Sequence, residues 1–523
     1  MLLPELLRSG IHALRGPYLV PAVLGAAFLY VVASYVAAYR RLRHFKGPWL
    51  GRFSSLWMLS RIPPGRQGPI YGDVVRKYNP DGPFVRVGPN DLVTNSPDVI
   101  RRMSGARSTY KRSAWYHAVK FNPYGDSLLS QTDTAVHDRL KAKMSFAYSG
   151  KDVPGLEGLI DEQLASLVDL IRRNYISKDY DEATGTASYK PMNLNNAISF
   201  FTLDVIGRIS YGKPFGYLAA DRDVNNYLGI LKLSMRTIVA SCDILPLQAV
   251  FLNPLFLKYF GPKTTDKEGL GCLMKIAQDI VTTRYGPDAK DSDDMVGSFI
   301  RHGVTAEECE QEVLLQIPAG ADSTAAGIKG TIMLLCQSPF AYRRLLQEID
   351  ETVRVNGLGD HQTISMELAR TLPYLQAVIY EGIRLTPPFT GLLMKEVPEG
   401  GDTFDGEFVP GGTRIGVAIG AVLLREDLFG KDVHMFRPER FLECDEATST
   451  RMRQTVELVF GYGRWMCAGK NIAFMELNKA YFELFRRFDM QLVNSRRPGR
   501  EVTLNLVWHE DLFVKVTERK PIV

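Results

Sequence analysis

The stretch that decides the fold is 460-FGYGRWMCAGK-470. Apolar residues at helical spacing follow it, which predicts a helix that begins near Lys470. Cys467 therefore lies in a glycine-rich loop just before a helix N-terminus, where free backbone N–H groups and the helix dipole favour a thiolate. The glycines of the stretch let the backbone approach a flat, bulky ligand closely. A buried, unreactive thiol is the usual role of a single cysteine, but these surroundings favour a ligand.

The longest predicted helix spans residues 305–337. Thr305 is its expected N-cap, Glu308 stands at the capping-box position, and Pro339 follows its end. At 1.5 Å per residue such a helix is roughly 48 Å long. It is therefore long enough to run through the centre of a large domain.

The middle of this helix contains two residues that weaken it. Pro318 lacks a backbone donor, and Gly320 is a poor helix former. We expect them to free a carbonyl and open a small groove, where Asp322 and Ser323 could hold a water or a diatomic ligand. A simple kink with a solvated aspartate accounts for the same residues.

The rest of the chain indicates a mainly α protein with a smaller β part. Alternating apolar residues around a Gly-Pro-Asn-Asp turn predict a hairpin over 83–94, and short strands are expected at 395–420 and 502–517. The polar run 285–295 is typical of an exposed loop. We find no repeat and no long linker after residue 66.

Composition excludes several classes of protein. The 523 residues are 45% hydrophobic and 23% charged, as in folded soluble proteins. A net charge of +5 spread over this length does not indicate nucleic-acid binding. Six scattered cysteines, none in a CxxC pair, suit reduced thiols in a reducing compartment.

The N-terminal part predicts a membrane anchor. Residues 18–39 carry no charge, and 22 helical residues span about 33 Å, enough for a bilayer core of about 30 Å. The basic run after residue 39 outweighs the basic residues before the span, so the body should face the cytosol. A cleaved signal peptide is the alternative, although the apolar run is long for one and lacks a small-x-small site. The expected organisation is a tail at 1–17, an anchor at 18–39, a basic and proline-containing hinge at 40–65, and a catalytic domain at 66–523.

The loop 460–470 resembles the cysteine-ligand loop of the cytochrome P450 superfamily, F-x-x-G-x-R-x-C-x-G. Phe460, Gly463, Cys467 and Gly469 match this pattern. Arg464 stands one position earlier than the arginine of the family, whose place Trp465 takes. The F-G-x-G-R-W-x-C variant is similar to fungal branches such as the pisatin demethylase-like enzymes. This departure puts a haem propionate partner in doubt, but not the cysteine ligand.

Three further segments resemble family motifs in the expected order. Residues 319–324, AGADST, are similar to A-G-x-[DE]-T-T of the oxygen-binding helix, with Ser323 replacing the first threonine. Glu381 and Arg384 form the E-x-x-R pair, and Arg440 belongs to an F-x-P-x-R-F segment. The resemblance covers roughly residues 40–515. It implies a cytochrome P450 fold, in which a long central helix lies over the haem and the three charged residues form one buried network.

The resemblance also implies a cofactor, haem b, and roles for individual residues. Cys467 is the expected metal ligand, Asp322 the expected proton relay, and Ser323 the residue that holds water or an oxygen ligand. The other expected cofactor-binding residues are Phe460, Arg464 and Gly469 in the loop and His137, Lys141 and Lys395 at the propionates. Tyr110 and Lys111 are weaker candidates for the propionates.

By family position, mostly apolar segments should line the substrate pocket. They contain Trp115, Tyr116, Phe121, Phe389, Leu392, Leu393, Leu506 and Trp508. Such a lining implies an apolar, medium-sized substrate, and the family reaction inserts one oxygen atom from O2 into it. Fungal secondary metabolism is the context that the resemblance implies.

The resemblance implies that electrons come from a partner. No flavin or nicotinamide fold fits beside a haem domain of this size, so we expect a membrane-bound NADPH–cytochrome P450 reductase. The docking face is expected among Arg139, Lys141, Lys143, Lys470, Lys479, Arg486 and Arg487. With the anchor, the expected location is the endoplasmic reticulum membrane, single-pass, with the catalytic domain in the cytosol.

Two alternative functions keep the haem. One is a haem-thiolate isomerase, dehydratase or ring-coupling enzyme, against which Asp322 and Ser323 argue because a proton relay would then have no purpose. The other is a non-catalytic haem-binding or interaction protein. Turnover with the reductase and NADPH separates the three.

Overall fold

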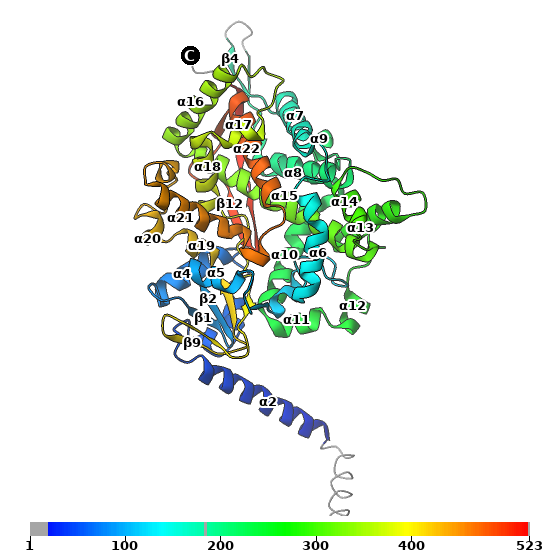
Figure 1. Ribbon diagram of the computed structural model, residues 1–523, viewed down its shortest axis with the longest axis vertical. Helices are drawn as coiled ribbons and strands as arrows, with labels where there is room; N and C mark the ends of the chain where they lie inside the picture. The colour runs from blue at the N-terminus through cyan, green and yellow to red at the C-terminus, as the bar shows by residue number, and fades with distance from the viewer. Residues whose placement is uncertain (1–18, 182–185, 521–523) are drawn as a thin grey trace, which may run out of the picture.

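The computed structural model describes residues 19–181 and 186–520 and is mainly helical with a smaller β part, as predicted (Figure 1). The predicted tail at 1–17 lies outside the described residues. The helices are α2 (Leu19–Arg41), α3 (Leu56–Leu59), α4 (Gln67–Tyr78), α5 (Pro97–Ser104), α6 (Thr134–Tyr148), α7 (Leu156–Asn174), α8 (Leu194–Tyr211), α9 (Tyr217–Ala220), α10 (Tyr227–Asp243), α11 (Leu245–Phe251), α12 (Pro254–Phe260), α13 (Gly269–Tyr285), α14 (Met295–Arg301), α15 (Ala306–Cys336), α16 (Pro339–Asn356), α17 (Met366–Arg370), α18 (Pro373–Leu385), α19 (Ile419–Leu423), α20 (Glu426–Phe429), α21 (Glu446–Val456) and α22 (Lys470–Arg487).

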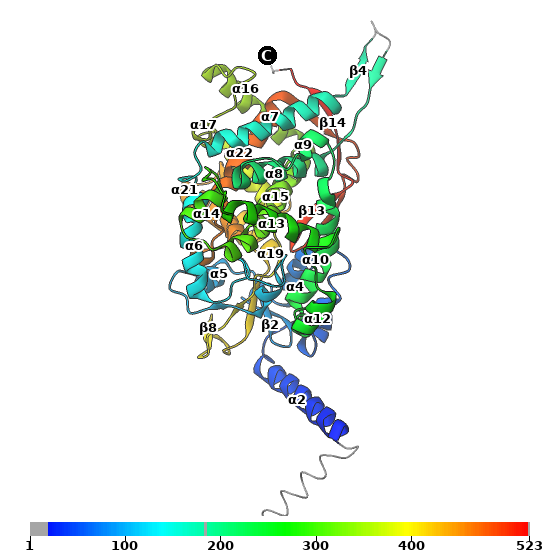
Figure 2. The ribbon, with the colours of Figure 1, turned by 90° about the vertical axis from the view of Figure 1, so that its right-hand side faces the viewer.

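Helix α15 runs through the centre of the molecule, with α8 and α22 on either side of it (Figures 1 and 2). The predicted capping box is present, since the Thr305 hydroxyl accepts from the Glu308 N–H while the Glu308 carboxylate accepts from the Thr305 N–H. The helix continues through Pro318 without ending. Gly320 serves packing, because a Cβ there would lie 2.7 Å from Ile206 Cδ1 of α8.

The strands form small sheets below and beside this helical core. The largest has the order β1-β2-β10-β7-β3, in which β2 and β10 are parallel and the other pairs antiparallel. The predicted hairpin at 83–94 is the β1–β2 pair of this sheet. The strands are β1 (Val85–Gly88), β2 (Asp91–Thr94), β3 (Lys111–Arg112), β4 (Lys178–Asp181), β5 (Thr186–Ser188), β6 (Met192–Asn193), β7 (Lys395–Glu396), β8 (Asp402–Phe404), β9 (Glu407–Val409), β10 (Arg414–Val417), β11 (Phe488–Leu492), β12 (Arg500–Leu504), β13 (Leu506–Glu510) and β14 (Phe513–Glu518).

The predicted charge network is present in the core. The Arg384 guanidinium pairs with Glu381 at 2.7 Å, and Arg440 pairs with the same carboxylate at 3.0 Å. All three residues are buried. Arg384 also donates to the carbonyls of Leu423 and Val433, so the network ties α18 to the segments that follow α19 and α20.

Helix α2 projects away from the body of the molecule (Figures 1 and 2). Within the described residues, Pro21–Arg41 has a mean hydropathy of 1.8, and no part of it is buried against the rest of the protein. Its length and composition would let it cross a membrane. Its last turn contacts the body, since the buried Arg86 donates to the carbonyls of Ala38 and Tyr39.

Candidate active site

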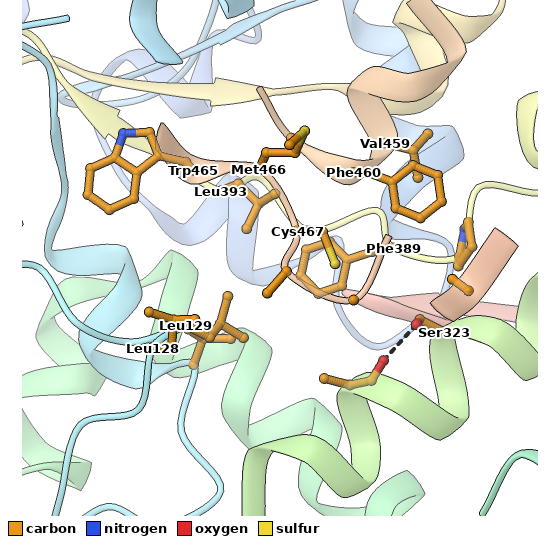
Figure 3. A pocket seen from close by; sticks show the side chains of 18 of the residues that line it. Leu128, Leu129, Ser323, Phe389, Leu393, Val459, Phe460, Trp465, Met466 and Cys467 are labelled. Carbon is orange, nitrogen blue, oxygen red and sulfur yellow. Dashed lines mark hydrogen bonds between the residues drawn. The ribbon is translucent and has the colours of Figure 1, made fainter. Parts of the chain in front are cut away.

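A cavity of about 350 Å³ lies between the 460–469 loop and α15. The loop contributes Cys467, and α15 contributes Ser323 from across the cavity (Figure 3). Further lining residues come from the segment 112–129, from α5, α6, α8, α10 and α22, and from the segments 388–395 and 505–506, among others. The cavity thus brings together most of the segments that the sequence predicted to contain site residues.

The cysteine loop is held by its own backbone. The Cys467 N–H donates to the Phe460 carbonyl at 2.7 Å, which closes the loop. Gly461 and Gly463 have φ of 76° and 56°, and a Cβ on Gly461 would lie 2.7 Å from the Trp465 carbonyl oxygen. Glycine is required at such positions, because other residues are strained there. Gly469, which lines the cavity, is the N-cap of α22.

Cys467 lines the cavity and is exposed there. Desolvation raises the pKa of this thiol, and the backbone N–H groups of Gly469 and Lys470 and the charge of Lys141 oppose the rise. The expected preference for a thiolate therefore does not follow from the helix N-terminus alone, because desolvation outweighs it. A metal cation deprotonates a coordinating thiol outright.

Three cations surround Trp465 at one end of the cavity, and we call Arg112, Lys141 and Lys395 the cation cluster. The Arg112 guanidinium lies 4.3 Å and the Lys395 ammonium 3.8 Å from the Trp465 ring centroid. Lys141 Nζ donates to the carbonyls of Arg464 and Met466, both at 2.7 Å. All three line the cavity.

The cation cluster has too few anions around it. Lys395 Nζ and Arg112 Nε are buried and have no hydrogen-bond partner among the described residues. The pKa of Lys395 is lowered well below its usual value, first by desolvation and then by the charges of Arg112 and Arg464. Buried charges are normally paired. The cluster therefore fits an anionic group at this end of the cavity, as the two propionates of a haem would supply with the metal toward Cys467.

Two other predicted residues surround the cluster. His137 is buried with its ring 4.4 Å from Trp465, and its Nδ1 lies 3.0 Å from Asp138. Desolvation lowers the pKa of His137 to about 4, so it is neutral at pH 7. Arg464 does not line the cavity, because its guanidinium turns to the Ala106 carbonyl and to Asp138. Trp465 takes its place in the lining.

Sequence reasoning missed Arg112 and named its neighbours instead. Tyr110 is buried elsewhere and donates to Asp402 at 2.8 Å, and Lys111 is exposed at the edge strand β3. Strand alternation was the available signal, because Lys111 and Arg112 must point to opposite faces. The antiparallel pairing of β3 with β7 places Arg112 opposite Lys395.

The α15 wall presents Ser323 but not Asp322. Ser323 lines the cavity, and its hydroxyl donates to the Ala319 carbonyl at 2.6 Å (Figure 3). Asp322 is buried outside the lining, where it accepts a hydrogen bond from Tyr227 at 2.5 Å. The two adjacent residues therefore face different surroundings.

The remaining lining is largely apolar. Of the residues predicted to line the pocket, Tyr116, Phe121, Phe389, Leu393 and Leu506 do so. Trp115, Leu392 and Trp508 are not in the lining. The indole N–H of Trp115 instead donates to the buried Asp243 at 2.8 Å.

Part of the expected docking face is buried. Lys479 is fully buried and bonds to Asp161 at 2.8 Å, and Arg486 and Arg487 lie against Glu483. Lys479 bonds to α7, and Arg486 and Arg487 also donate to backbone carbonyls in the segment 358–362, so these residues hold α22 to its neighbours and are not a free surface. Arg139 is exposed, and its guanidinium pairs with Glu308 at 2.9 Å.

Comparison with known proteins gives one consistent result. A sequence model of the family described as Cytochrome P450 matches residues 65–514. Cytochrome P450 monooxygenase ABA1 of Pyricularia oryzae is 51% identical, covering 95% of this chain and 96% of that protein. Cytochrome P450 monooxygenase aba1 of Botryotinia fuckeliana is 41% identical over 91% of this chain and 92% of its own. Cytochrome P450 monooxygenase abl1 of Leptosphaeria maculans is 38% identical over 88% and 80%.

The fold is shared with a solved structure, the crystal structure of the cytochrome P450DA heme domain. The TM-score is 0.71 over 91% of this chain and 96% of that chain. At 15% sequence identity this likeness shows the fold alone.

Proposed function

The chain belongs to the cytochrome P450 family as a monooxygenase, and we propose that it inserts one oxygen atom from O2 into an apolar, medium-sized molecule of fungal secondary metabolism. The observation that supports this reaction is the cavity that joins Cys467, the cation cluster and Ser323. The family implies a haem cofactor, and we propose haem b. Cys467 would be its metal ligand, and the cation cluster with His137 would hold its propionates.

A thiolate-ligated haem activates dioxygen and favours cleavage of the O–O bond. The side chains of this protein would supply binding, orientation and protons. Arg112 and Lys395 would fix the cofactor, because two anionic groups would satisfy their unpaired donors. Phe460 and Gly469 would leave room for a flat ring beside the loop.

On the opposite wall, Ser323 would hold a water, since its hydroxyl can accept a hydrogen bond while it donates to Ala319. Asp322 would be the source of the proton. Desolvation raises its pKa to about 6, close enough to neutral pH to give and regain a proton.

The apolar lining supports an apolar substrate. Phe389 and Leu393 come from one segment, and Leu128 and Leu129 from another (Figure 3). Leu506 also lines the cavity. A small number of polar groups among apolar walls is typical of sites that bind small molecules. Such walls also exclude water from the reacting position.

The electron donor and location are further parts of the proposal. We propose an NADPH–cytochrome P450 reductase as the donor, because the haem domain occupies nearly all of the chain. Residues 18–39 would anchor a cytosolic domain, 66–523, to the endoplasmic reticulum membrane through the hinge at 40–65. The exposed, apolar surface of α2 before Arg40 supports the anchor.

The reaction can be tested by turnover under labelled oxygen. The full chain would be reconstituted with a reductase, NADPH and ¹⁸O2, and screened against apolar molecules by mass spectrometry. We expect a product that has gained one labelled oxygen atom. Products that are rearranged or dehydrated without labelled oxygen would contradict the proposal.

A further inference from the structure

The buried Asp322 is tied to the first residue of α10. Tyr227 donates its phenolic hydrogen bond to Asp322 Oδ2 at 2.5 Å, and both side chains are buried. Asp322 does not line the cavity, although Gly320, Ser323 and Thr324 beside it do. In this position the carboxyl group is hydrogen-bonded away from the cavity that its proton would have to reach.

Other charged and titratable groups also act on Asp322. Lys329 lies two turns later on α15, and Asp223 precedes α10. Desolvation raises the pKa of Asp322, Tyr227 and Lys329 lower it, and Asp223 raises it. Tyr217 of α9 is the remaining titratable neighbour, and its hydroxyl donates to the Val224 carbonyl rather than to Asp322. Within the described residues, Tyr227 donates the side-chain hydrogen bond to this carboxylate.

Helix α10 connects this bond to the cavity. Met235 and Ile238, further along the same helix, line the cavity. They lie about 12–17 Å from Tyr227 along the helix axis. Asn225 and Asn226, just before Tyr227, have φ of 60° and 52°, a conformation that few residues other than asparagine and glycine adopt. A shift of α10 that makes room beside Met235 and Ile238 would therefore also move Tyr227.

We propose that Tyr227 is a positioning residue that holds Asp322 away from the cavity until a molecule in the cavity displaces α10. Release of the hydrogen bond lets the carboxyl turn toward Ser323 and pass its proton to the water held there, leaving the carboxylate. That water in turn gives one of its own protons to the cavity. Proton delivery is thereby restricted to the filled cavity. This inference rests on the proposed oxygen-inserting function.

The test compares variants in NADPH consumption with reductase and without substrate. Tyr227→Phe removes the hydrogen bond and keeps the ring. We expect it to raise substrate-free NADPH consumption several-fold, because Asp322 is no longer held. The double variant Tyr227→Phe/Asp322→Asn should fall back to the rate of Asp322→Asn alone. An unchanged rate in Tyr227→Phe would overturn the proposal.

Two control variants separate positioning from other effects. Tyr217→Phe removes a neighbouring buried hydroxyl that does not bond to Asp322, and it should leave the substrate-free rate unchanged. Lys329→Gln keeps a donor for Asn195 and Ser199 but removes the positive charge that lowers the Asp322 pKa. It should therefore raise that pKa without releasing the carboxyl. Equal acceleration in Lys329→Gln would mean that the pKa alone matters, and would overturn the positioning role.

A spectroscopic measurement tests the hydrogen bond between Tyr227 and Asp322 without turnover. The infrared band of protonated Asp322, assigned by its loss in Asp322→Asn, can be titrated in the holoenzyme. The wild-type midpoint should lie at about pH 6. Tyr227→Phe should move it upward, because the ionised form loses a donor, whereas Tyr217→Phe should not. If the titration midpoint of Asp322 is the same in Tyr227→Phe as in the wild type, the hydrogen bond between Tyr227 and Asp322 is contradicted. Absence of a thiolate-type carbon monoxide spectrum in the wild type would instead overturn the proposed function.

Discussion

Two buried clusters of charge in this molecule are balanced in opposite ways. In the Glu381 network, Arg384 and Arg440 share one carboxylate and donate further N–H groups to backbone carbonyls, and Arg440 also pairs with Asp432 at 3.1 Å. In the cation cluster, Lys395 and Arg112 retain buried donor atoms that have no partner in the part of the chain that the structure describes. Both clusters are buried in the fold. Among the described residues, the protein supplies partners for the charges of the Glu381 network but not for all those of the cation cluster.

The difference separates structural charge from charge that awaits a ligand. Removing one member of a satisfied network leaves an unpaired buried charge, which costs stability. Removing one cation from the cation cluster removes both its repulsion by the neighbouring cations and the free-energy cost of burying its charge. The same kind of substitution should therefore have opposite effects on the stability of the haem-free protein in the two places.

Glu381→Gln should have the largest effect on stability. It leaves Arg384 and Arg440 without their shared carboxylate, and we expect a loss of about 3–5 kcal/mol in the free energy of unfolding, measured by urea denaturation. Glu351→Gln is the matched control, because its ion pair with Arg354 is exposed and is expected to contribute little to stability. Equal effects of the two substitutions would remove the structural role of the network.

Lys395→Met should act in the opposite direction on the haem-free protein. It removes an unpartnered buried ammonium while keeping the length of the side chain, and we expect a gain of about 1–3 kcal/mol in the free energy of unfolding. The same variant should lose haem faster to apomyoglobin, because one propionate partner is gone. Lys111→Met on the exposed edge of β3 should change neither quantity. If the haem-free Lys395→Met protein is less stable than the wild type, the unpaired charge of Lys395 does not cost stability, and the contrast with the Glu381 network is wrong.

The pH dependence of the stability of the haem-free protein gives a second test of the buried charge of Lys395. The pKa of Lys395 is lowered in the fold, so the unfolded chain binds more protons between the lowered pKa and the usual value of about 10.4. Stability of the haem-free wild type should therefore rise with pH in that window, and below it the penalty is fully present. Urea denaturation across the alkaline range should show a smaller rise in Lys395→Met than in the wild type.

Arg464→Gln should have the smallest effect. Its guanidinium is partly exposed, pairs with Asp138 and lies outside the cavity lining. We expect a change below about 1 kcal/mol in stability and little change in the rate of haem transfer. A loss of haem as fast as in Lys395→Met would show that Arg464 reaches the cofactor after all.

Local features of the fold followed from the sequence. The Thr305–Glu308 capping box, the 83–94 hairpin and the glycine loop around Cys467 each depend on residues that are close in the chain. The Glu381 network was expected from resemblance, since Arg440 is remote in sequence. The catalytic roles of Cys467, Asp322 and Ser323 remain predictions.

Several contacts between distant segments were not predicted. The Tyr227–Asp322 hydrogen bond joins residues 95 positions apart, and no pattern in either segment indicates it. Lys479 was expected on the surface because lysine usually is, but the carboxylate of Asp161 from α7 holds it in the core. The position of Arg112 beside Lys395 follows from the pairing of β3 with β7, which joins segments distant in the sequence.

The most direct test of Cys467 as the haem ligand is the absorption spectrum of the dithionite-reduced protein under carbon monoxide, recorded for the wild type and for Cys467→Ala. We expect a strongly red-shifted Soret band in the wild type and its loss in Cys467→Ala. A histidine-type Soret band in the wild type, or a red-shifted band that survives in Cys467→Ala, would contradict Cys467 as the haem ligand.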